Sequence, residues 1–419
     1  MYNFYIRDNL KGVEIMEINE INIEDIVKQV MREMVGNNSG SKSASEKGSI
    51  AKTSRVAMLT GERKIELKEF KVPEISEDEI LVKVEGCGVC GTDVHEYKGD
   101  PFGLIPVVLG HEGSGEIVKI GKNVKRDTAG KSVSVGDKLV SCVIPCGECE
   151  PCLSNPGRAN LCENAKIFGL LPDDEVHLNG WFGEYLVLRK GATFFNVTGM
   201  NLNQRLLIEP AAVVVHAVER AKTTGIIKFN SKVVVQGCGP IGLLLISVVR
   251  TLGVENIVAV DGDENRLKMA KKMGATKTVN FMKHDGIEAL TKAVQEACGG
   301  LGADFAFQCT GVPKAAANIW KFIKRGGGLC EVGFFVNGGD CTINPHFDIC
   351  NKEVTVVGSW TYTPQDYPTT IDFIKRATGI GLPLEDLITH RFPLEKLNEA
   401  MEVNIKQEGI KVVYVNENF

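Results

Sequence analysis

The stretch that decides the fold is residues 233–242, Val-Val-Val-Gln-Gly-Cys-Gly-Pro-Ile-Gly, which joins three valines to a Gly-x-Gly-x-x-Gly turn. The residues after it, to about residue 252, predict an apolar helix. A strand, a glycine turn and a helix in this order are typical of a dinucleotide-binding unit. Gly237 allows the tight turn, Gly239 lets the backbone approach a diphosphate, and Gly242 lets helix and strand pack closely.

An acidic residue follows the next apolar run, where this motif requires one. Asp261 would accept hydrogen bonds from an adenosine ribose and repel a 2′-phosphate, so the sequence predicts NAD(H) as the cofactor. Arg266 would either lie along that ribose or neutralise Asp261. Pro240 and Ile241 complete the predicted cofactor-binding set, and the diphosphate would lie at the helix N-terminus. The alternative is a glycine-rich turn in an α/β domain that binds no nucleotide.

The glycine turn lies in a larger region, residues 211–357, in which apolar strands alternate with helical segments. This alternation predicts the α/β class, with a doubly wound parallel sheet that forms a Rossmann domain. The predicted strands are residues 233–235, 257–260, 278–281, 304–309, 329–332 and 354–357.

The region before it, residues 53–210, has short strands that glycines and prolines interrupt often. This pattern predicts a β-barrel domain. The mixed segment 358–419 is expected to return to that first domain. Clear strands in the first domain are residues 80–84, 115–120 and 138–140.

The composition is that of a globular protein with a full core. The chain has 419 residues, of which 43% are hydrophobic, and this length suggests two or three domains. With 48 Lys+Arg against 53 Asp+Glu, the net charge of −5 argues against nucleic acid as the main partner. We see no apolar run of about 18 residues that would span a membrane and no secretory signal, so we expect a cytoplasmic protein.

Four of the 13 cysteines form a compact pattern, with Cys146, Cys149 and Cys152 at intervals of three and Cys162 ten residues on. Four thiolates can close a tetrahedron around zinc and leave no open position, which predicts a structural zinc site. Disulfides or an iron–sulfur cluster are the alternatives. Cys90 belongs to another group, and the remaining eight are interpreted as small buried hydrophobic residues: Cys87, Cys142, Cys238, Cys298, Cys309, Cys330, Cys341 and Cys350.

A second set of possible metal ligands is spread along the chain. It consists of Cys90, His111 with Glu112, and Glu209. One thiolate, one imidazole and one carboxylate can hold a zinc that keeps a position open for substrate. Spacing alone does not join these pieces, because each taken singly is equally a buried cysteine, a turn histidine or a glutamate at a helix start.

The motifs in this order resemble the zinc-dependent medium-chain alcohol dehydrogenases. The resemblance covers about residues 53–419 and implies a GroES-like catalytic domain, a Rossmann domain, and hydride transfer at a zinc between them. The motifs are Gly-Cys-Gly-Val-Cys-Gly-Thr-Asp (86–93), Gly-His-Glu-Gly-Ser-Gly (110–115), the cysteine lobe, Glu-Pro-Ala-Ala (209–212) and the glycine turn.

The resemblance also implies roles for single residues. Cys90, His111 and Glu209 are similar to the catalytic zinc ligands, and Glu112 to an alternate ligand that exchanges with water. Asp93 resembles the acceptor that orients the ligand histidine. In the same way, Thr92 resembles the hydroxyl that hydrogen-bonds the substrate oxygen, and His95 the outer end of a proton relay.

Some details depart from the common pattern of the family. Glutamate at position 209 is more similar to polyol, butanediol and threonine dehydrogenases than to the ethanol-oxidising branch. The interval between Cys152 and Cys162 is two residues longer than usual. Residues 127–134 and 170–181 are also longer than expected, and they would shape the substrate entrance.

The N-terminal extension, residues 1–52, differs from the rest of the chain. Apolar residues recur with helical spacing over 22–35, and a polar Gly/Ser-rich linker follows at 36–52. With Met-Glu-Ile-Asn-Glu at 16–20, the segment 16–35 is similar to encapsulation peptides of bacterial microcompartment enzymes, which would bind a shell protein or a lumen enzyme. The alternative is a helix that serves oligomer contacts or docks on its own catalytic domain. A possible ribosome-binding sequence before Met16 leads us to expect translation from that residue.

The predicted function is a zinc-dependent, NAD-linked alcohol dehydrogenase that recycles NAD inside a microcompartment. It would interconvert a small alcohol or diol and its aldehyde or ketone, with one catalytic and one structural zinc in each subunit of a homodimer or homotetramer. The alternative within the enzyme class is a cytosolic polyol or threonine dehydrogenase. The alternative outside the enzyme class is a binding or scaffold protein on the same fold that lacks the catalytic zinc and holds at most one zinc ion.

Overall fold

The computed structural model describes residues 50–417, and the described residues from Ala51 onward belong to one compact unit. The predicted helix 22–35, the encapsulation-peptide-like segment 16–35 and most of the linker lie outside the described residues. In the part that is described, no helix combines the length and the apolar character needed to cross a membrane.

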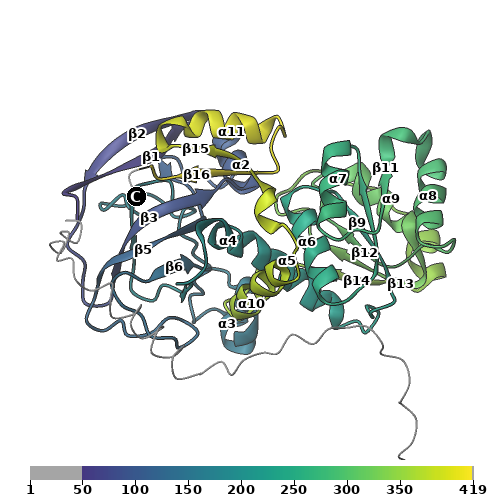
Figure 1. Cartoon of the computed structure of the whole chain (residues 1–419), viewed down its shortest axis with the longest axis horizontal. Coiled ribbons are helices and arrows are strands. Elements are labelled where there is room, and N and C mark those ends of the chain that lie inside the picture. The colour runs from purple at the N-terminus through teal and green to yellow at the C-terminus, as the bar shows by residue number, and fades with distance from the viewer. Residues whose placement is uncertain (1–49, 418–419) are drawn as a thin grey trace, which may run out of the picture. The chain divides into compact units, whose positions relative to one another are not determined.

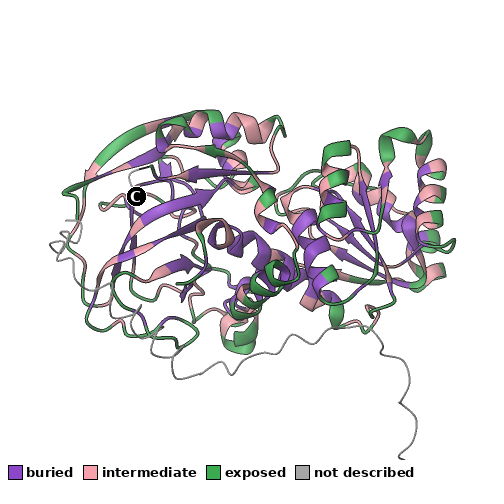
Figure 2. Ribbon diagram, in the orientation of Figure 1, coloured by how far each residue is buried: buried purple, intermediate pink, exposed green. Residues whose placement is uncertain are grey.

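The predicted parallel sheet is present. The described residues contain a six-stranded sheet in the order β11-β10-β9-β12-β13-β14, and every neighbouring pair in it is parallel. Helices cover it on both faces (Figure 1). The central strands β9, β10 and β12 are largely buried (Figure 2), whereas the edge strand β14 is largely exposed. The strands are β9 (Lys232–Gln236), β10 (Asn256–Asp261), β11 (Lys277–Asn280), β12 (Ala303–Gln308), β13 (Ile323–Glu331) and β14 (Thr355–Gly358), and the helices are α6 (Pro240–Thr251), α7 (Glu264–Lys272), α8 (Gly286–Ala297) and α9 (Pro313–Ile319).

All six strands predicted in this region are confirmed, and their ends lie within one residue of the predicted ends except at the start of β13. β13 begins at Ile323, six residues before the predicted start, because Lys324, Arg325 and three glycines hide its first half from a search for apolar runs. Phe281 is not in β11, since it begins a short 3-10 turn after Asn280.

The strands of the rest of the described chain form mainly antiparallel sheets, as expected for the predicted β-barrel domain, and β15 and β16 are a parallel pair. One described sheet has the order β15-β16-β3-β5-β6-β8, with β7 also paired to β3, and a smaller one has the order β2-β1-β4. The bounds are β1 (Thr53–Gly61), β2 (Lys64–Lys71), β3 (Ile80–Gly88), β4 (Val107–Val108), β5 (Glu112–Ile120), β6 (Lys138–Ser141), β7 (Tyr185–Leu188), β8 (Phe194–Asn196), β15 (Ile388–Phe392) and β16 (Lys411–Val415).

The C-terminal strand lies in the same sheet as the N-terminal strands. β16 pairs antiparallel with β3, so that Val413 lies opposite Gly88. This pairing brings residues more than three hundred positions apart in the chain to the same end of the barrel. The remaining helices are α2 (Gly91–Gly99), α3 (Glu150–Ser154), α4 (Leu202–Leu206), α5 (Ile208–Lys222), α10 (Asp366–Gly379) and α11 (Leu397–Ile405).

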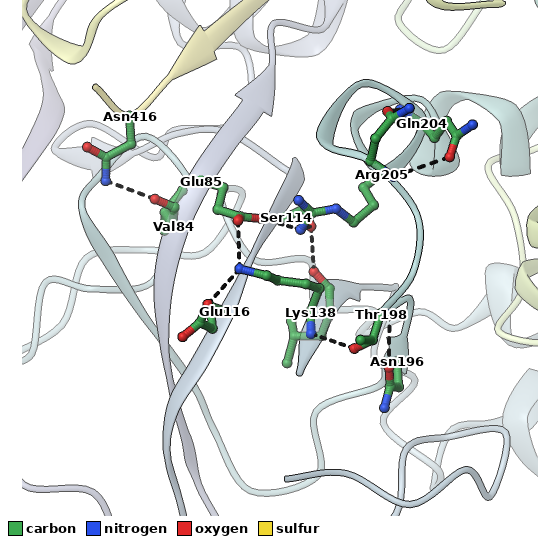
Figure 3. A network of polar contacts seen from close by, with 12 residues as sticks. Val84, Glu85, Ser114, Glu116, Lys138, Asn196, Thr198, Gln204, Arg205 and Asn416 are labelled. Carbon is green, nitrogen blue, oxygen red and sulfur yellow. Dashed lines mark hydrogen bonds and ion pairs between the residues drawn. The ribbon is translucent and has the colours of Figure 1, made fainter. Parts of the chain in front are cut away.

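A buried polar network ties α4 to the barrel strands (Figure 3). Arg205 of α4 forms an ion pair with Glu85 of β3, and its Nη1 donates a hydrogen bond to Ser114 Oγ at 3.0 Å. Lys138 Nζ contacts both Glu85 Oε1 at 2.7 Å and Glu116 Oε2 at 2.6 Å. Because α5 follows α4 directly, this network fixes the start of the helix that carries Glu209.

Candidate metal centres and active site

The four lobe cysteines lie together around two short helical turns. Cys149 caps the N-terminus of α3, Cys152 lies within α3, and Cys162 ends the 3-10 helix Pro156–Leu161. The four Sγ atoms all lie within 4.8 Å of one another, and none of the four cysteines forms a disulfide. Backbone N–H groups point at these sulfurs, and such hydrogen bonds lower the pKa of the Cys146 thiol to about 6.

This geometry fits a closed tetrahedral zinc site, because zinc prefers thiolates and four sulfurs leave no coordination position free. The disulfide alternative is wrong for these residues, since none of them is bonded to another. The interpretation of the eight remaining cysteines as buried is wrong in part. Cys341 and Cys350 are exposed and Cys309 is half-buried, because they lie in or next to loops outside the regular strands.

The second group brings together residues from two separate segments of the chain. Cys90 caps the N-terminus of α2, His111 immediately precedes β5, and Glu112 is the first residue of β5. Their ligand atoms lie within 4.8 Å of one another. Burial alone lowers the pKa of the His111 imidazole, but the effect of Asp93 and Cys90 is larger and raises this pKa well above its ordinary value. The surroundings therefore favour a positive charge at this position. A thiolate, an imidazole and a carboxylate around such a position fit a zinc ion.

Asp93 holds this group in place from behind. It is fully buried, and its two carboxylate oxygens accept the backbone N–H of Cys90 at 2.8 Å and that of Gly110 at 3.2 Å. One of these oxygens also lies 3.4 Å from Nδ1 of His111. Asp93 therefore links the helix cap, the glycine turn before His111 and the imidazole, as a carboxylate behind a metal-bound histidine does.

Glu209 lies in the first turn of α5 and is buried. It lines a cavity that Cys90, His111 and Glu112 also line. Burial raises the pKa of its carboxyl group to about 7, although His111 and a hydrogen bond with Tyr362 act in the opposite direction. Glu209 is not part of the compact group of Cys90, His111 and Glu112. Its role as third ligand stays a prediction, and in the described geometry Glu112 is the carboxylate nearer the thiolate and the imidazole.

Lys411 is a site residue that sequence reasoning missed. It is the first residue of β16, it is only 3% exposed, and it forms an ion pair with Glu112. Its Nζ also donates a hydrogen bond to the Val89 carbonyl at 3.2 Å. Burial lowers the pKa of this lysine, but Glu112 and Cys90 outweigh that effect and raise it above its ordinary value. No local motif marks Lys411, because its partner comes from the other end of the chain.

Gly88 makes room for this ion pair. A Cβ atom at this position would lie 1.9 Å from Glu112 Oε2 and 2.7 Å from Lys411 Cε. Any larger residue would therefore displace the two charged side chains.

The two predicted relay residues are placed differently. Thr92 lines the cavity, and its Oγ1 lies 3.7 Å from Cys90 Sγ. His95 packs edge-on against the ring of Phe335, with 5.4 Å between ring centroids, and burial lowers the pKa of its imidazole. Thr92 is thus next to the metal-binding group, whereas His95 is one helical turn further along α2.

The predicted cofactor turn has the geometry that its glycines require. Gly237 has a φ of 94°, Gly239 caps the N-terminus of α6, and a Cβ at Gly242 would lie 1.8 Å from the Gly237 carbonyl oxygen. The carboxylate of Asp261 accepts the N–H of Cys238 at 2.7 Å and so fixes this turn to the end of β10. Arg266 donates a hydrogen bond to the Gln407 carbonyl at 3.3 Å.

A cavity of about 400 Å³ joins the two predicted sites. One wall holds the metal-binding group, and another holds Pro240 and Ile241 of the cofactor turn. Hydrophobic side chains make up much of the remaining wall: Val89, Phe102, Ile167, Leu170, Val213, Val332, Phe334, Phe335 and Trp360.

Comparison with known proteins identifies the family. Residues 76–197 match the family described as alcohol dehydrogenase GroES-like domain, and residues 240–376 match the zinc-binding dehydrogenase family. Sorbitol dehydrogenase of Bacillus subtilis is 32% identical over 86% of this chain and 97% of its own length. The chain belongs to the zinc-binding dehydrogenase family. L-threonine 3-dehydrogenase of Bacillus licheniformis is also 32% identical, over 82% of this chain and 93% of its own.

Solved structures agree with the fold of this zinc-binding dehydrogenase. An alcohol dehydrogenase from Thermotoga maritima, 30% identical, has a TM-score of 0.80 over 87% of this chain and 100% of its own. The 2R,3R-butanediol dehydrogenase of Bacillus subtilis, 28% identical, has a TM-score of 0.73 over the same shares. Zinc and NAD(H), the cofactors predicted from the sequence, are typical of this family. The predicted family and fold class are confirmed.

Proposed function

We propose that this zinc-binding dehydrogenase is an NAD-linked enzyme that interconverts a small alcohol or diol and its aldehyde or ketone. The observation that carries the proposal is the single cavity lined by Cys90, His111 and Glu112 on one side and by the cofactor turn on the other. A substrate oxygen at the metal-binding group and a nicotinamide at the turn would face each other across it.

Each residue has one task in the proposed reaction, in which an alcohol and NAD⁺ give a carbonyl compound, NADH and a proton. Bound zinc would act as a Lewis acid that favours loss of the alcohol proton or polarises the carbonyl oxygen. Thr92, which lines the cavity, would accept the hydroxyl proton while donating its own proton outward, and His95 would pass a proton on to solvent. Asp93 keeps His111 oriented. When bound, the nicotinamide would accept the carbon-bound hydrogen of the alcohol as hydride.

On the cofactor side, Asp261 and the turn would choose the dinucleotide. The free N–H groups at the N-terminus of α6 would hold the diphosphate. The Asp261 carboxylate would bind the ribose hydroxyls and repel the 2′-phosphate of NADP(H). Arg266 donates a hydrogen bond to the Gln407 carbonyl, and its place along the ribose stays a prediction.

A substrate panel tests this proposal. The purified chain would be assayed by absorbance with C2–C6 alcohols, diols, polyols and their carbonyl compounds, each with NAD(H) and with NADP(H). We expect reversible hydride transfer with NAD(H). Absence of turnover with every member of the panel, in zinc-loaded protein, would refute an alcohol dehydrogenase function.

The relatives leave a second function open within the same chemistry. Sorbitol dehydrogenase and L-threonine 3-dehydrogenase match this chain equally well, and Glu209 is similar to the residue of that branch. In that case the chain would be a cytosolic polyol or threonine dehydrogenase whose N-terminal helix serves oligomer contacts. Preferred oxidation of sorbitol or L-threonine in the panel would select this alternative.

For location, we propose the lumen of a bacterial microcompartment, with residues 16–35 as the targeting segment. The support is the sequence itself, in which apolar residues recur at helical spacing before a Gly/Ser-rich segment. In such a compartment, aldehyde reduction would restore NAD⁺ from NADH. A fluorescent protein carrying residues 16–40 should gather in co-expressed shells, and diffuse fluorescence would contradict the proposal.

We also propose that the chain forms a homodimer or homotetramer. Light scattering would measure the molar mass of the assembly.

A further inference from the structure

The loop between β14 and α10 forms one continuous part of the cavity wall. Its residues Ser359, Trp360, Thr361 and Tyr362, which we call the Trp360 loop, all line the cavity. Trp360 is 49% exposed, so the protein interior does not fix the position of its ring. Thr361 has a φ of 45°, a left-handed conformation that costs free energy in a β-branched residue and persists only where surrounding contacts hold it. The Trp360 loop therefore depends on contacts with other parts of the chain.

Few hydrogen bonds reach the middle of this loop. At its start, a backbone N–H donates to the Glu331 carbonyl at 3.0 Å and fixes the loop to β13. After its end, the N–H and the hydroxyl of Thr363 donate to Asp366 Oδ2, at 2.7 and 2.8 Å. Between these two anchors, the only hydrogen bond to the backbone of residues 360–362 within the described chain comes from the side chain of Asn160.

Asn160 belongs to the cysteine lobe. It lies in the 3-10 helix Pro156–Leu161, between Cys152 and Cys162, and it is only 3% exposed. Its Nδ2 donates a hydrogen bond to the Trp360 backbone carbonyl at 2.8 Å. Its Oδ1 is also buried and has no hydrogen-bond partner among the described residues, which is costly. The donor side of this amide, and not its acceptor, therefore sets its orientation.

His216 of α5 orients the same amide from another side. Its Nδ1 lies 2.9 Å from Asp366 Oδ2, and because a carboxylate only accepts hydrogen bonds, this nitrogen carries a proton. In the neutral imidazole, Nε2 is then an acceptor, and it lies 3.4 Å from Asn160 Nδ2. Both N–H groups of the Asn160 amide therefore have partners, and its contact with the Trp360 carbonyl is fixed.

We infer that Asn160 is a positioning residue through which the cysteine lobe, residues 146–162, holds the Trp360 loop at the substrate cavity. Cys162 ends the short helix that carries Asn160, and the backbone N–H of Cys146 donates to Cys162 Sγ at 3.2 Å. The helix is therefore attached to the lobe sulfurs, and a change at these sulfurs reaches the cavity wall through the Asn160 amide. The inference rests on the proposed function, which makes the cavity the substrate site.

Tryptophan fluorescence tests the inference without turnover. Of the three tryptophans, Trp181 is fully buried and Trp320 is 9% exposed, so quenching by acrylamide reports mainly Trp360. A Trp360→Phe protein gives the signal of the other two. We expect the Stern–Volmer constant of Trp360 to rise by at least about 1.5-fold in Asn160→Ala, because a loop released from its anchor exposes the ring more often. Asn160→Asp keeps the size of the side chain but removes the donor, so it should give the same rise and serves if the alanine variant does not fold.

The matched control is Asn416→Ala, which removes a similar asparagine elsewhere (Figure 3). Asn416 is 7% exposed, its Nδ2 donates to the Val84 carbonyl at 2.8 Å, and it does not line the cavity. Quenching in this control should equal that of the wild type. Wild-type quenching in both Asn160 variants would overturn the positioning role.

A lobe variant tests the link to the cysteines. Cys146→Ser, or Cys152→Ser if the first does not fold, should raise the Stern–Volmer constant as much as Asn160→Ala does. Combining the lobe variant with Asn160→Ala should give no further rise, because both changes act through one hydrogen bond. Wild-type quenching in the lobe variant, or additive effects in the combined variant, would overturn the link.

Kinetics test the consequence for the substrate, with the alcohol of the C2–C6 panel that has the highest kcat/KM. Asn160→Ala should raise its KM by at least about threefold and change kcat by less than about twofold, since the wall acts on substrate binding. An unchanged KM would overturn the inference and leave the dehydrogenase function intact. Absence of turnover in the wild type with the whole panel would overturn the proposed function, and the quenching result would still decide the role of Asn160.

Discussion

The ion pair between Lys411 and Glu112 allows a quantitative prediction. The two side chains are 3% and 2% exposed, so Lys411→Met leaves a buried carboxylate without its partner. Breaking a buried pair in this way costs roughly 3–5 kcal/mol. A zinc ion beside Glu112 would compensate part of that charge, so we expect a loss of about 3 kcal/mol in the zinc-loaded protein. This loss is a large share of the roughly 5–15 kcal/mol by which a folded protein is usually stable.

Equilibrium urea unfolding, followed by far-UV circular dichroism, would measure this loss. Lys411→Arg keeps the charge and should lie within about 1 kcal/mol of the wild type, whereas adding Glu112→Gln to Lys411→Met should recover much of the loss. The matched surface control is Lys64→Met, which breaks the exposed pair with Glu66 and should cost at most about 0.5 kcal/mol. If Lys411→Met is no less stable than Lys64→Met, the buried pair does not have the role assigned to it.

Three further predictions concern other parts of the molecule. Arg205→Ala should lower the free energy of unfolding by roughly 3 kcal/mol in urea, because it leaves Glu85 with one cation instead of two; a loss below about 1 kcal/mol would contradict this. Asp261→Ser should raise kcat/KM for NADP⁺ relative to NAD⁺ by at least about tenfold, and an unchanged ratio would count against its role. Burial, with help from Asp100, raises the pKa of Glu96 to about 7, so the folded state binds this proton more tightly than the unfolded state. The contribution of Glu96 to the free energy of unfolding is therefore complete below pH 4.5 and is lost as the pH rises towards 7. Between these pH values, the free energy of unfolding should decline less in Glu96→Gln than in the wild type.

Features that depend on local sequence could be predicted. The strands of the parallel sheet are short apolar runs, and the cysteine lobe has its four ligands within 17 residues, so neighbouring positions carry the signal. The glycine turn was equally visible, because each glycine answers a steric requirement inside one strand–turn–helix unit.

Features that depend on distant pairing could not be derived in this way. Lys411 contacts Glu112 only because β16 and β5 both pair with β3. In the sequence, a single lysine before an apolar run gives no indication of a buried partner. The cavity wall has the same origin, since Phe102 and Trp360 come from loops of different parts of the chain. The proposed ligands of the catalytic zinc rest on resemblance to a family, because spacing alone does not connect Cys90 with His111.

The most direct test of the account is the zinc content of the wild-type protein and of Cys90→Ser, measured by mass spectrometry of the metal together with NADH formation. The account predicts two zinc ions per chain in the wild type, and one in Cys90→Ser with loss of hydride transfer, because the cysteine lobe keeps its own ion. A single zinc in the wild type, or a Cys90→Ser protein that retains two zinc ions and full activity, would contradict the assignment of a catalytic metal at Cys90, His111 and the neighbouring glutamates.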